Sequence, residues 1–262
     1  MHIDLSGRVA IVTGAGRGIG REIARTLARE KVVVYGTDID PEGLWSLAAE
    51  ADPLLLPRKC DVRDFPAIQT LVAEIVEARG RLDILVNNAG VAVTGWLEDV
   101  PEEDWDLNLD TNLKGVYLMC KAVIPQMKRQ RSGRIINAAS FAAIVPSLGS
   151  AAYAASKAGV HYLTRTLAGE LGPWGITVNC YAPGMIPTQM NHFTERPQAV
   201  QERLLDTLTI RRWGEPHEVA SLVCFLASDH AAYITGTLVD VSGGKLATQI
   251  PRIAYEREQE TE

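Results

Sequence analysis

The sequence lacks the features that mark secreted, metal-binding and membrane-spanning proteins. No run approaches the roughly 20 apolar residues needed to cross a bilayer, and residues 1–5 lack the basic and apolar regions of a signal peptide. The cysteines form no Cys-x-x-Cys pair, so neither a zinc site nor a redox motif is indicated; they are Cys60, Cys120, Cys180 and Cys224. We therefore expect a cytoplasmic protein with reduced, buried thiols and no metal.

An excess of basic residues is also missing. The formal charge of -6 argues against a partner such as nucleic acid or an anionic membrane, which would require a basic face. Hydrophobic residues make up 47% and charged residues 22%, which is enough for a full core and does not indicate disorder. With 262 residues and no repeat, coiled coil or linker, we expect a single domain over 1–262 with small-molecule partners.

A glycine-rich turn follows the first apolar run of the chain. Residues 8–13 predict a strand that ends on the pattern Gly14-x-x-x-Gly18-x-Gly20, and helical spacing follows at Ile19, Ile23 and Leu27. A junction of strand, glycine loop and helix lets backbone N–H groups and the positive helix end meet a pyrophosphate. The alternative is a purely structural loop.

The second strand, predicted over 32–37, delivers an acidic residue at its end. Asp38 lies 18 residues past Gly20, where a carboxylate can accept hydrogen bonds from the adenosine ribose of NAD. Asp40 competes for this role, but it precedes Pro41 and is typical of a helix N-cap. We assign the ribose to Asp38.

Arg17 favours a different cofactor, because a cation in the glycine loop could hold the extra phosphate of NADP. Two like charges about 4 Å apart repel by about 4 kcal/mol at an effective dielectric of about 20, so Asp38 would disfavour that phosphate. We expect NAD in preference to NADP. The alternative for Arg17 is a surface arginine paired with a nearby acid.

The remaining chain continues the alternation of strands and helices. Further strands are predicted over 54–60, 82–86, 135–139, 175–181 and 236–241, with helical spacing between them. The fourth strand ends on Asn87-Asn88-Ala89-Gly90. In a parallel sheet such a turn faces the ligand crevice, although it can also be a turn and nothing more.

Two predicted helices carry polar side chains whose positions suggest a chemical role. Asn112 lies within a long helical pattern over 102–130, and it indicates either a local distortion or a solvent-facing amide. Tyr153 and Lys157 share one helical face, and a cation beside a phenol favours the phenolate. The pair is a candidate general acid/base, while Ser140 ends the fifth strand.

The segment 185–212 is polar and irregular, and we expect it to form a lid over the substrate. His192 in this segment is either a substrate contact or simply solvated. The tail, 245–262, is increasingly charged, and we expect it to fray or to pack on a neighbouring subunit.

These motifs together resemble the short-chain dehydrogenase/reductase family over about residues 5–244. The resemblance rests on the glycine pattern, Asn87-Asn88-Ala89-Gly90, Tyr153-x-x-x-Lys157, and on Asn112, Ser140, Pro183, Gly184 and Thr188. It implies an α/β fold: a single-domain, Rossmann-like, doubly wound sheet of seven parallel strands with helices on both faces. It also implies a homotetramer or homodimer, with 102–130 and 151–172 as packing surfaces between subunits.

The resemblance further implies a role for each site residue. Tyr153 would exchange a proton with the substrate oxygen, and Ser140 would hydrogen-bond the same oxygen. Lys157 would hold the nicotinamide ribose and lower the tyrosine's pKa, and together with the cofactor's positive ring it could bring that pKa from about 10 to about 7. Asn112 would anchor a water. The implied cofactor-binding residues are Gly14, Arg17, Gly18, Ile19, Gly20, Asp38, Asp61, Val62, Asn88, Ala89, Gly90, Tyr153, Lys157, Pro183, Gly184, Ile186 and Thr188. Ser242 departs from the aspartate that many members carry there.

Three functions remain open at this point. The first is an oxidoreductase that acts on a secondary alcohol or its ketone, such as a sugar, polyol or small hydroxy compound. The second is an NADPH-dependent 3-oxoacyl-[acyl-carrier-protein] reductase, and the third is a nucleotide-sensing protein without catalysis. The substrate would lie among 91–97, 141–149 and 185–212, where apolar residues predict a wall without a fixed charge: Val93, Ile144, Val145 and Leu148.

Overall fold

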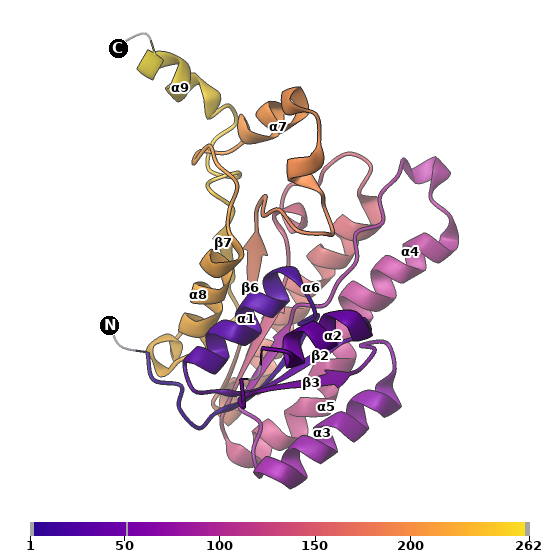
Figure 1. Ribbon diagram of the computed structural model, residues 1–262, viewed down its shortest axis with the longest axis vertical. Coiled ribbons are helices and arrows are strands. Elements are labelled where there is room, and N and C mark those ends of the chain that lie inside the picture. The colour runs from indigo at the N-terminus through magenta and orange to yellow at the C-terminus, as the bar shows by residue number, and fades with distance from the viewer. Residues whose placement is uncertain (1–2, 51, 260–262) are drawn as a thin grey trace.

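The computed structural model describes residues 3–50 and 52–259, which form one seven-stranded sheet with helices on both faces (Figure 1). The strand order is β3-β2-β1-β4-β5-β6-β7, and all six pairings are parallel. The expected doubly wound fold is confirmed. The strands are β1 (Val9–Thr13), β2 (Val33–Asp38), β3 (Leu55–Lys59), β4 (Ile84–Asn87), β5 (Gly133–Ala138), β6 (Ile176–Pro183) and β7 (Leu238–Val241).

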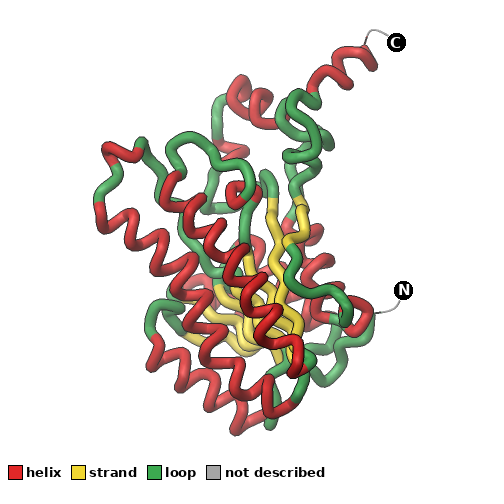
Figure 2. The backbone as a smooth tube through the Cα atoms, turned by 180° about the vertical axis from the view of Figure 1, so that it is seen from behind, coloured by secondary structure: helices red, strands yellow, loops and turns green. Residues whose placement is uncertain are grey.

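Each face of the sheet is covered by its own set of helices (Figures 1 and 2). One hydrophobic cluster joins the strands to α1 (Gly18–Arg29), α2 (Pro41–Ala48) and α8 (Pro216–Ala227). The other joins them to α3 (Phe65–Arg79), α5 (Gly115–Gln130) and α6 (Ala151–Leu171). Because both faces are covered, β1 is buried along its whole length, as its unbroken apolar sequence predicts.

The strand ends differ from the predicted ones where pairing extends a strand beyond its apolar run. β5 begins at Gly133, which pairs with Ile176. β6 continues to Pro183, which pairs with Val241 at the sheet's edge. Backbone hydrogen bonds, which are independent of side-chain polarity, therefore set these boundaries.

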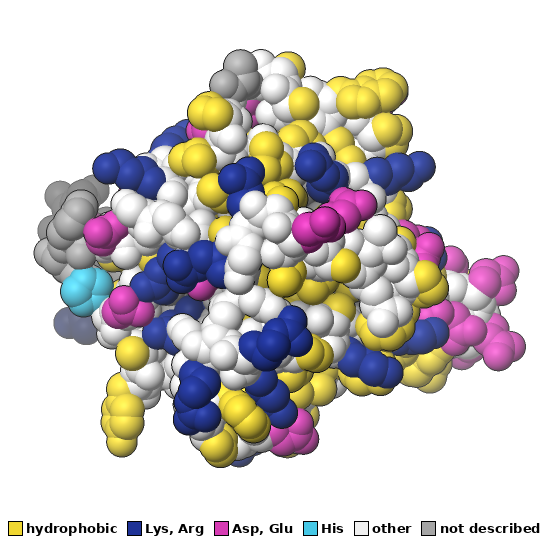
Figure 3. Space-filling view, turned by 90° about the horizontal axis from the view of Figure 1, so that it is seen from below, with side chains coloured by type: hydrophobic (Ala, Val, Ile, Leu, Met, Phe, Trp, Pro, Cys, Tyr) yellow, Lys and Arg dark blue, Asp and Glu magenta, His cyan; other side chains and the backbone are white. Residues whose placement is uncertain are grey.

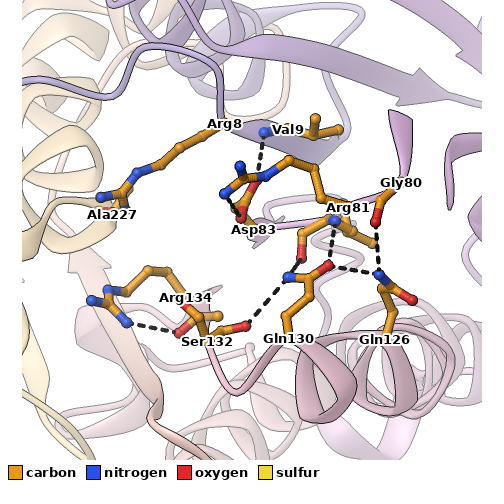
Figure 4. Close-up of polar contacts among 12 residues, drawn as sticks. Arg8, Val9, Gly80, Arg81, Asp83, Gln126, Gln130, Ser132, Arg134 and Ala227 are labelled. Carbon is orange, nitrogen blue, oxygen red and sulfur yellow. Dashed lines mark hydrogen bonds and ion pairs between the residues drawn. The ribbon is translucent and has the colours of Figure 1, made fainter. Parts of the chain in front are cut away.

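The amino-terminal ends of the strands form the base of the molecule, where side chains bond to backbone groups between elements (Figure 4). The Gln130 amide accepts from the Leu82 N–H at 2.8 Å and donates to the Leu82 carbonyl at 3.0 Å. The buried Asp83 carboxylate accepts from the Val9 N–H at 2.8 Å and from Arg81. These bonds satisfy backbone groups that the loops at the base leave unpaired.

Seen from below, the base carries Lys and Arg side chains over much of its surface (Figure 3). Exposed examples include Lys31, Arg81, Arg129 and Arg131. Arg129 lies in the last turn of α5, where a cation interacts favourably with the helix dipole. The base is therefore polar and closed, whereas the loops at the opposite end carry the predicted site.

Candidate active site

The glycine loop leads from β1 into α1 with the geometry that a pyrophosphate requires. Gly14 and Gly18 have φ angles of 66° and 55°, in the region that favours glycine. The N-cap residue of α1, Arg17, makes no side-chain cap, so the first N–H groups of the helix remain available. A Cβ on Gly20 would lie 2.1 Å from the Gly14 carbonyl oxygen, so α1 packs tightly on the loop. These features fit the phosphates of a dinucleotide.

Asp38 stands at the end of β2 with its carboxylate turned to the glycine loop. It accepts hydrogen bonds from the Gly16 N–H at 2.9 Å and the Asp40 N–H at 3.0 Å. Asp40 accepts from the Glu42 N–H as the N-cap of α2, so its prediction as a cap is confirmed. Arg17 is exposed and donates to the Gln189 side chain at 3.4 Å, so its partner is an amide and not the acid considered above.

Asp61 and Val62 follow β3 at the same edge of the sheet. Arg63 donates several hydrogen bonds to the Asp61 carboxylate and lowers its pKa. Val62 is buried and packs against Gly115, where an added Cβ would lie 2.8 Å from a Val62 methyl carbon. Asp61 is half-buried and remains able to meet a ligand at this edge.

The turn after β4 is tied to the glycine loop. The Thr13 hydroxyl accepts from the Asn88 and Ala89 N–H groups, both at 3.0 Å. The Asn88 amide donates to the Thr13 carbonyl at 3.1 Å and accepts from the Tyr181 hydroxyl at 3.0 Å. These bonds fix the turn between β1 and β6. A turn that only reversed the chain would not need them.

Asn112 lies in a π-helical turn, Asp110–Lys114, that separates α4 (Glu102–Leu109) from α5. Its amide accepts from the Val91 N–H at 2.8 Å and donates to the Val91 carbonyl at 2.9 Å and the Ser156 hydroxyl at 3.0 Å. The side chain is fully buried, so the local distortion is confirmed and the solvent-facing alternative is wrong. π turns are rare and frequently lie at functional sites.

Tyr153, Lys157 and Ser140 come together between α6 and the end of β5. The buried Lys157 ammonium donates to the Ala138 carbonyl at 2.8 Å, and its Nζ lies 5.8 Å from the Tyr153 ring centroid. The Ser140 hydroxyl accepts from the Ala142 N–H at 3.1 Å. Burial lowers the pKa of Lys157 to about 8.

Burial raises the pKa of Tyr153 above its ordinary value in the protein alone, because burial penalises the phenolate. A hydrogen bond with Ser140 acts in the opposite direction. The expected fall toward 7 relies on the cofactor's positive ring in addition to Lys157, so it stays a prediction.

Gly90 lies where these groups meet. A Cβ at this position would stand 3.0 Å from the Asn112 side-chain oxygen and 3.5 Å from the Lys157 Nζ. A larger residue would therefore press on both groups. Asn112, Ser140, Tyr153 and Lys157, which come from three separate elements, thus lie in one region.

The loop after β6 provides the remaining predicted residues. The Gly184 N–H donates to the Val241 carbonyl at 3.0 Å, and Ile186 is buried. A Cβ on Gly18 would lie 3.5 Å from the Thr188 methyl, so this loop reaches the start of α1. Pro183 ends β6 beside it.

The expected lid, 185–212, contains α7 (Gln198–Leu205) and is bonded to the loop after β7. The Ile210 N–H donates to the Gly243 carbonyl at 2.8 Å. His192 is exposed and lies 2.9 Å from a Glu195 carboxylate oxygen, as a solvated histidine would.

The tail does not fray over its described residues. It forms α9 (Arg252–Gln259), and the Tyr255 hydroxyl donates to the Thr209 carbonyl at 2.7 Å and accepts from the Arg211 N–H at 3.1 Å. Residues 260–262 of the expected tail lie outside the described residues. The tail therefore packs on the lid of its own chain.

Two segments at the rim meet above the site. The Gly95 N–H donates to the Gly149 carbonyl at 2.8 Å, which joins 91–97 to 141–149. Their exposed apolar side chains agree with the predicted apolar wall: Trp96, Leu97, Ile144, Val145 and Leu148. Sequence reasoning missed Lys245, whose Nζ lies 5.1 Å from the ring centroid of Phe141, next to Ser140.

Two hollows accompany the site. One of about 610 Å³ lies between α3 and α5, and none of the predicted site residues lines it. A smaller one of about 280 Å³ lies between the lid and the end of β7, and Ile186 lines it. Within residues 3–50 and 52–259, no group of three or more His, Cys, Asp or Glu side chains is arranged to hold a metal ion. No helix of that part of the chain could span a membrane.

Comparison with known proteins agrees with this geometry. Residues 14–245 match the family model described as enoyl-(acyl carrier protein) reductase. The chain is 42% identical to the 3-oxoacyl-[acyl-carrier-protein] reductase FabG of Thermotoga maritima, over 92% of this chain and 98% of that protein. It is 41% identical to the oxidoreductase UcpA of Salmonella typhimurium, over 92% and 95% of the two chains.

A solved structure shows the same fold. Levodione reductase superposes with a TM-score of 0.88 and is 35% identical, with 93% of this chain and 99% of that chain covered. The sequence match and the shared fold extend over nearly the whole chain, including every predicted site residue. The protein therefore belongs to the short-chain dehydrogenase/reductase family of oxidoreductases.

Proposed function

We propose that this chain transfers hydride reversibly between a nicotinamide dinucleotide and a secondary alcohol or its ketone, such as a sugar, polyol or small hydroxy compound. The observation that carries the proposal is the Lys157 ammonium buried beside Tyr153, with Nζ 5.8 Å from the ring centroid and a pKa lowered to about 8. A buried cation is costly to maintain, and a role in proton exchange accounts for it.

The site residues would divide the work as follows. When bound, the nicotinamide accepts or gives the hydride. The Tyr153 hydroxyl holds the proton that the substrate oxygen gains or loses, and Ser140 donates a hydrogen bond to that oxygen. Lys157 stabilises the phenolate form, and Asn112 holds a water that connects Lys157 to solvent. The cation of the oxidised cofactor would add to Lys157 in opposing the effect of burial on the Tyr153 pKa.

The remaining residues would bind the dinucleotide. Gly14 to Gly20 would hold the pyrophosphate at the start of α1, and Asp61 and Val62 would flank the adenine. Asn88, Ala89 and Gly90 would form the floor of the site. The loop after β6 would contact the nicotinamide end through Pro183, Gly184, Ile186 and Thr188.

NAD is the proposed cofactor in preference to NADP. The Asp38 carboxylate is held at the glycine loop by two N–H groups, where it would accept from ribose hydroxyls and repel a phosphate. Arg17 donates to Gln189 in the lid. Asp38→Ala should narrow the preference for NAD, measured as the ratio of kcat/KM for the two cofactors; an unchanged ratio would remove Asp38 from this role.

A second candidate function is reduction of 3-oxoacyl groups on an acyl carrier protein, with NADPH. It is favoured by the name of the Thermotoga maritima relative and by Arg17 in the glycine loop. The two candidates differ in substrate, so an acyl thioester tested beside sugars, polyols and hydroxy acids separates them.

The deciding experiment follows nicotinamide absorbance with each cofactor across that substrate panel. Tyr153→Phe should reduce kcat by about 10²- to 10⁴-fold with dinucleotide binding nearly intact. Retained activity would exclude Tyr153 as the acid/base. Binding of the dinucleotide without turnover of any substrate would favour a nucleotide-sensing protein.

The proposed assembly is a homodimer or homotetramer that packs through 102–130 and 151–172. Support comes from large apolar side chains that these helices expose, namely Trp105, Tyr117 and Tyr162. Light scattering of Tyr117→Asp and Tyr162→Asp variants tests this, because a buried charge would dissociate the subunits. A cytoplasmic location is proposed from the buried, free cysteines.

A further inference from the structure

Lys245 follows the glycine turn that ends β7 and projects between the lid and the catalytic loop. Its Nζ donates to the Thr207 hydroxyl at 2.8 Å and lies 5.1 Å from the Phe141 ring centroid. Its backbone N–H donates to the Ser242 hydroxyl at 3.1 Å, which fixes where the side chain starts. Phe141, which this ammonium faces, is the residue after Ser140, the group proposed to bind the reacting oxygen.

Among the described residues, no acidic side chain neutralises the charge of Lys245. It is half-buried, and within the part of the chain that the structure describes no carboxylate forms an ion pair with it. Its direct polar partner, Thr207, is a neutral hydroxyl that already donates to the Leu204 carbonyl at 2.6 Å. Burial lowers the pKa of Lys245, with no acidic neighbour to oppose the effect. A partly desolvated ammonium without a counter-charge is unfavourable, and a bound anion would remove the cost.

We propose that Lys245 binds an anionic group of the substrate, a carboxylate or a phosphate, and so selects anionic secondary alcohols and ketones. This rests on the proposed function, since the anion must reach Lys245 while the reacting carbon lies at Tyr153 and Ser140. The three Nζ protons suit either anion.

The surroundings of Lys245 indicate the rest of the substrate. The Phe141 ring faces the ammonium, Ser140 precedes it in the chain, and the same segment exposes Ile144, Val145 and Leu148. A substrate that spans from Ser140 to Lys245 would therefore place apolar carbon against Phe141. The substrate class is an oxo or hydroxy compound with a short apolar body and one anionic end.

A purely mechanical role for Lys245 is the competing explanation. Its bond to Thr207 could simply hold the lid, because Thr207 lies two residues past the end of α7. Such a role would affect every substrate alike, charged or neutral. Thr207→Val removes the hydrogen bond and keeps the ammonium, so it separates the two roles.

The test compares pairs of substrates that share the reacting ketone and differ in whether the far end is anionic. 5-Oxohexanoate is paired with its methyl ester, and dihydroxyacetone phosphate with dihydroxyacetone, which also distinguishes a carboxylate from a phosphate site. kcat/KM is measured for the wild type, Lys245→Met, Lys245→Arg and Thr207→Val. Methionine keeps an unbranched apolar chain against Phe141 while removing the charge.

Lys245→Met should lower kcat/KM for the preferred anionic substrate by about tenfold or more and change its neutral partner by less than about twofold. Lys245→Arg should restore most of the preference, and Thr207→Val should leave it intact. An equal effect of Lys245→Met on both members of a pair, or no effect, would overturn the inference.

Failure of the proposed function has a different signature. If the wild type turns over neither member of either pair, binding of 5-oxohexanoate and of dihydroxyacetone phosphate to the dinucleotide complex is measured by calorimetry. Weaker binding of either anion to Lys245→Met supports the anion site without the proposed reaction. Identical binding of both anions to the two proteins rejects the site.

Discussion

The two ends of the sheet use charged side chains in opposite ways. At the base, Asp83 is buried and its carboxylate is satisfied by the Val9 N–H and by Arg81. At the opposite end, Lys157 is buried with a backbone carbonyl as its bonded partner, and Lys245 is half-buried with a hydroxyl. At the base a buried carboxylate is paired with a cation, whereas the two cations at the site end have neutral partners among the described residues.

The two ends differ in degree, because one buried polar atom at the base also lacks a hydrogen-bond partner. The Arg134 guanidinium is buried, its Nε has no hydrogen-bond partner, and burial lowers its pKa. Asp229, however, supplies an ionic partner at 3.3 Å. The contrast therefore lies in carboxylate partners, which Arg81 and Arg134 have at the base and which Lys157 and Lys245 lack among the described residues. Stability and function are concentrated at different ends of the same strands.

The largest effect is expected at Lys157. Lys157→Met should lower kcat by at least about 100-fold, since the phenolate loses its neighbouring cation. The same change should stabilise the fold by about 1 to 3 kcal/mol at pH 7, because the folded protein no longer buries an ammonium. Steady-state kinetics and guanidinium unfolding measure the two effects, and a less stable variant at pH 7 would contradict the contrast between the two ends.

The stabilisation by Lys157→Met should depend on pH in a defined direction. The pKa of Lys157 falls from 10.5 to about 8 on folding. Below about pH 8 both states carry the proton, so the folded wild type bears the full cost of burial. Between about pH 8 and 10.5 the folded state releases the proton first, and wild-type stability rises relative to the variant. The unfolding curves of the wild type and of Lys157→Met should therefore differ at pH 7 and lie closer together at pH 10.

The next effect is expected at the glycine loop. Gly20→Ala would place a Cβ 2.1 Å from the Gly14 carbonyl oxygen and 2.4 Å from the Asn88 amide nitrogen. We expect the free energy of unfolding to fall by about 1 to 3 kcal/mol and the dinucleotide to bind more weakly. Thermal unfolding and calorimetry measure the two effects. Gly169→Ala in α6 is the control, because no atom lies within 4 Å of its added Cβ. It should stabilise the helix by about 0.5 to 1 kcal/mol.

A similar loss of stability is expected at the base, without a loss of catalysis. Asp83→Ala leaves the buried Val9 N–H without an acceptor and removes the ion pair with the exposed Arg81, which should lower the free energy of unfolding by about 1 to 3 kcal/mol. The exposed Glu74→Ala should change the free energy of unfolding by less than about 0.5 kcal/mol. If Asp83→Ala lowers kcat at a temperature where it is fully folded, the two ends are not functionally separate.

The smallest effect is expected where the tail meets the lid. Tyr255→Phe removes the hydrogen bonds with the Thr209 carbonyl and the Arg211 N–H. Hydrogen exchange at the Arg211 amide should rise by about tenfold or less, with little change in global stability. Tyr233→Phe is the control, because Tyr233 is fully exposed. Unchanged exchange at Arg211 would show that the tail does not order the lid.

The sequence predicted the seven strands and their positions along the chain well, because apolar runs and helical spacing are local patterns. Asp38 at the end of β2 and Ser140 after β5 could be predicted for the same reason, since strand ends meet at one edge of a parallel sheet. The ends of β5 and β6 could not, because pairing with a neighbouring strand sets them.

Contacts between distant segments were also beyond the sequence. Lys245 bonds to Thr207, 38 residues away, and lies over Phe141 from another part of the chain. The tail's packing on the lid through Tyr255 has the same character. The rise of the Tyr153 pKa in the protein alone was also beyond the sequence, because burial depends on the whole fold and outweighs the hydrogen bond with Ser140.

The π turn that holds Asn112 makes the arrangement of the site depend on the number of residues between α4 and α5. Its extra residue rotates α5 by about 100° relative to a continuation of α4. Deleting one residue within 110–114 would restore an ordinary helix and preserve its hydrophobic composition. It would also turn Tyr117 and Lys121 away from their present directions and separate Asn112 from Val91. A deletion that keeps the composition of the helix would thus separate the site residues, because it rotates α5 relative to α4.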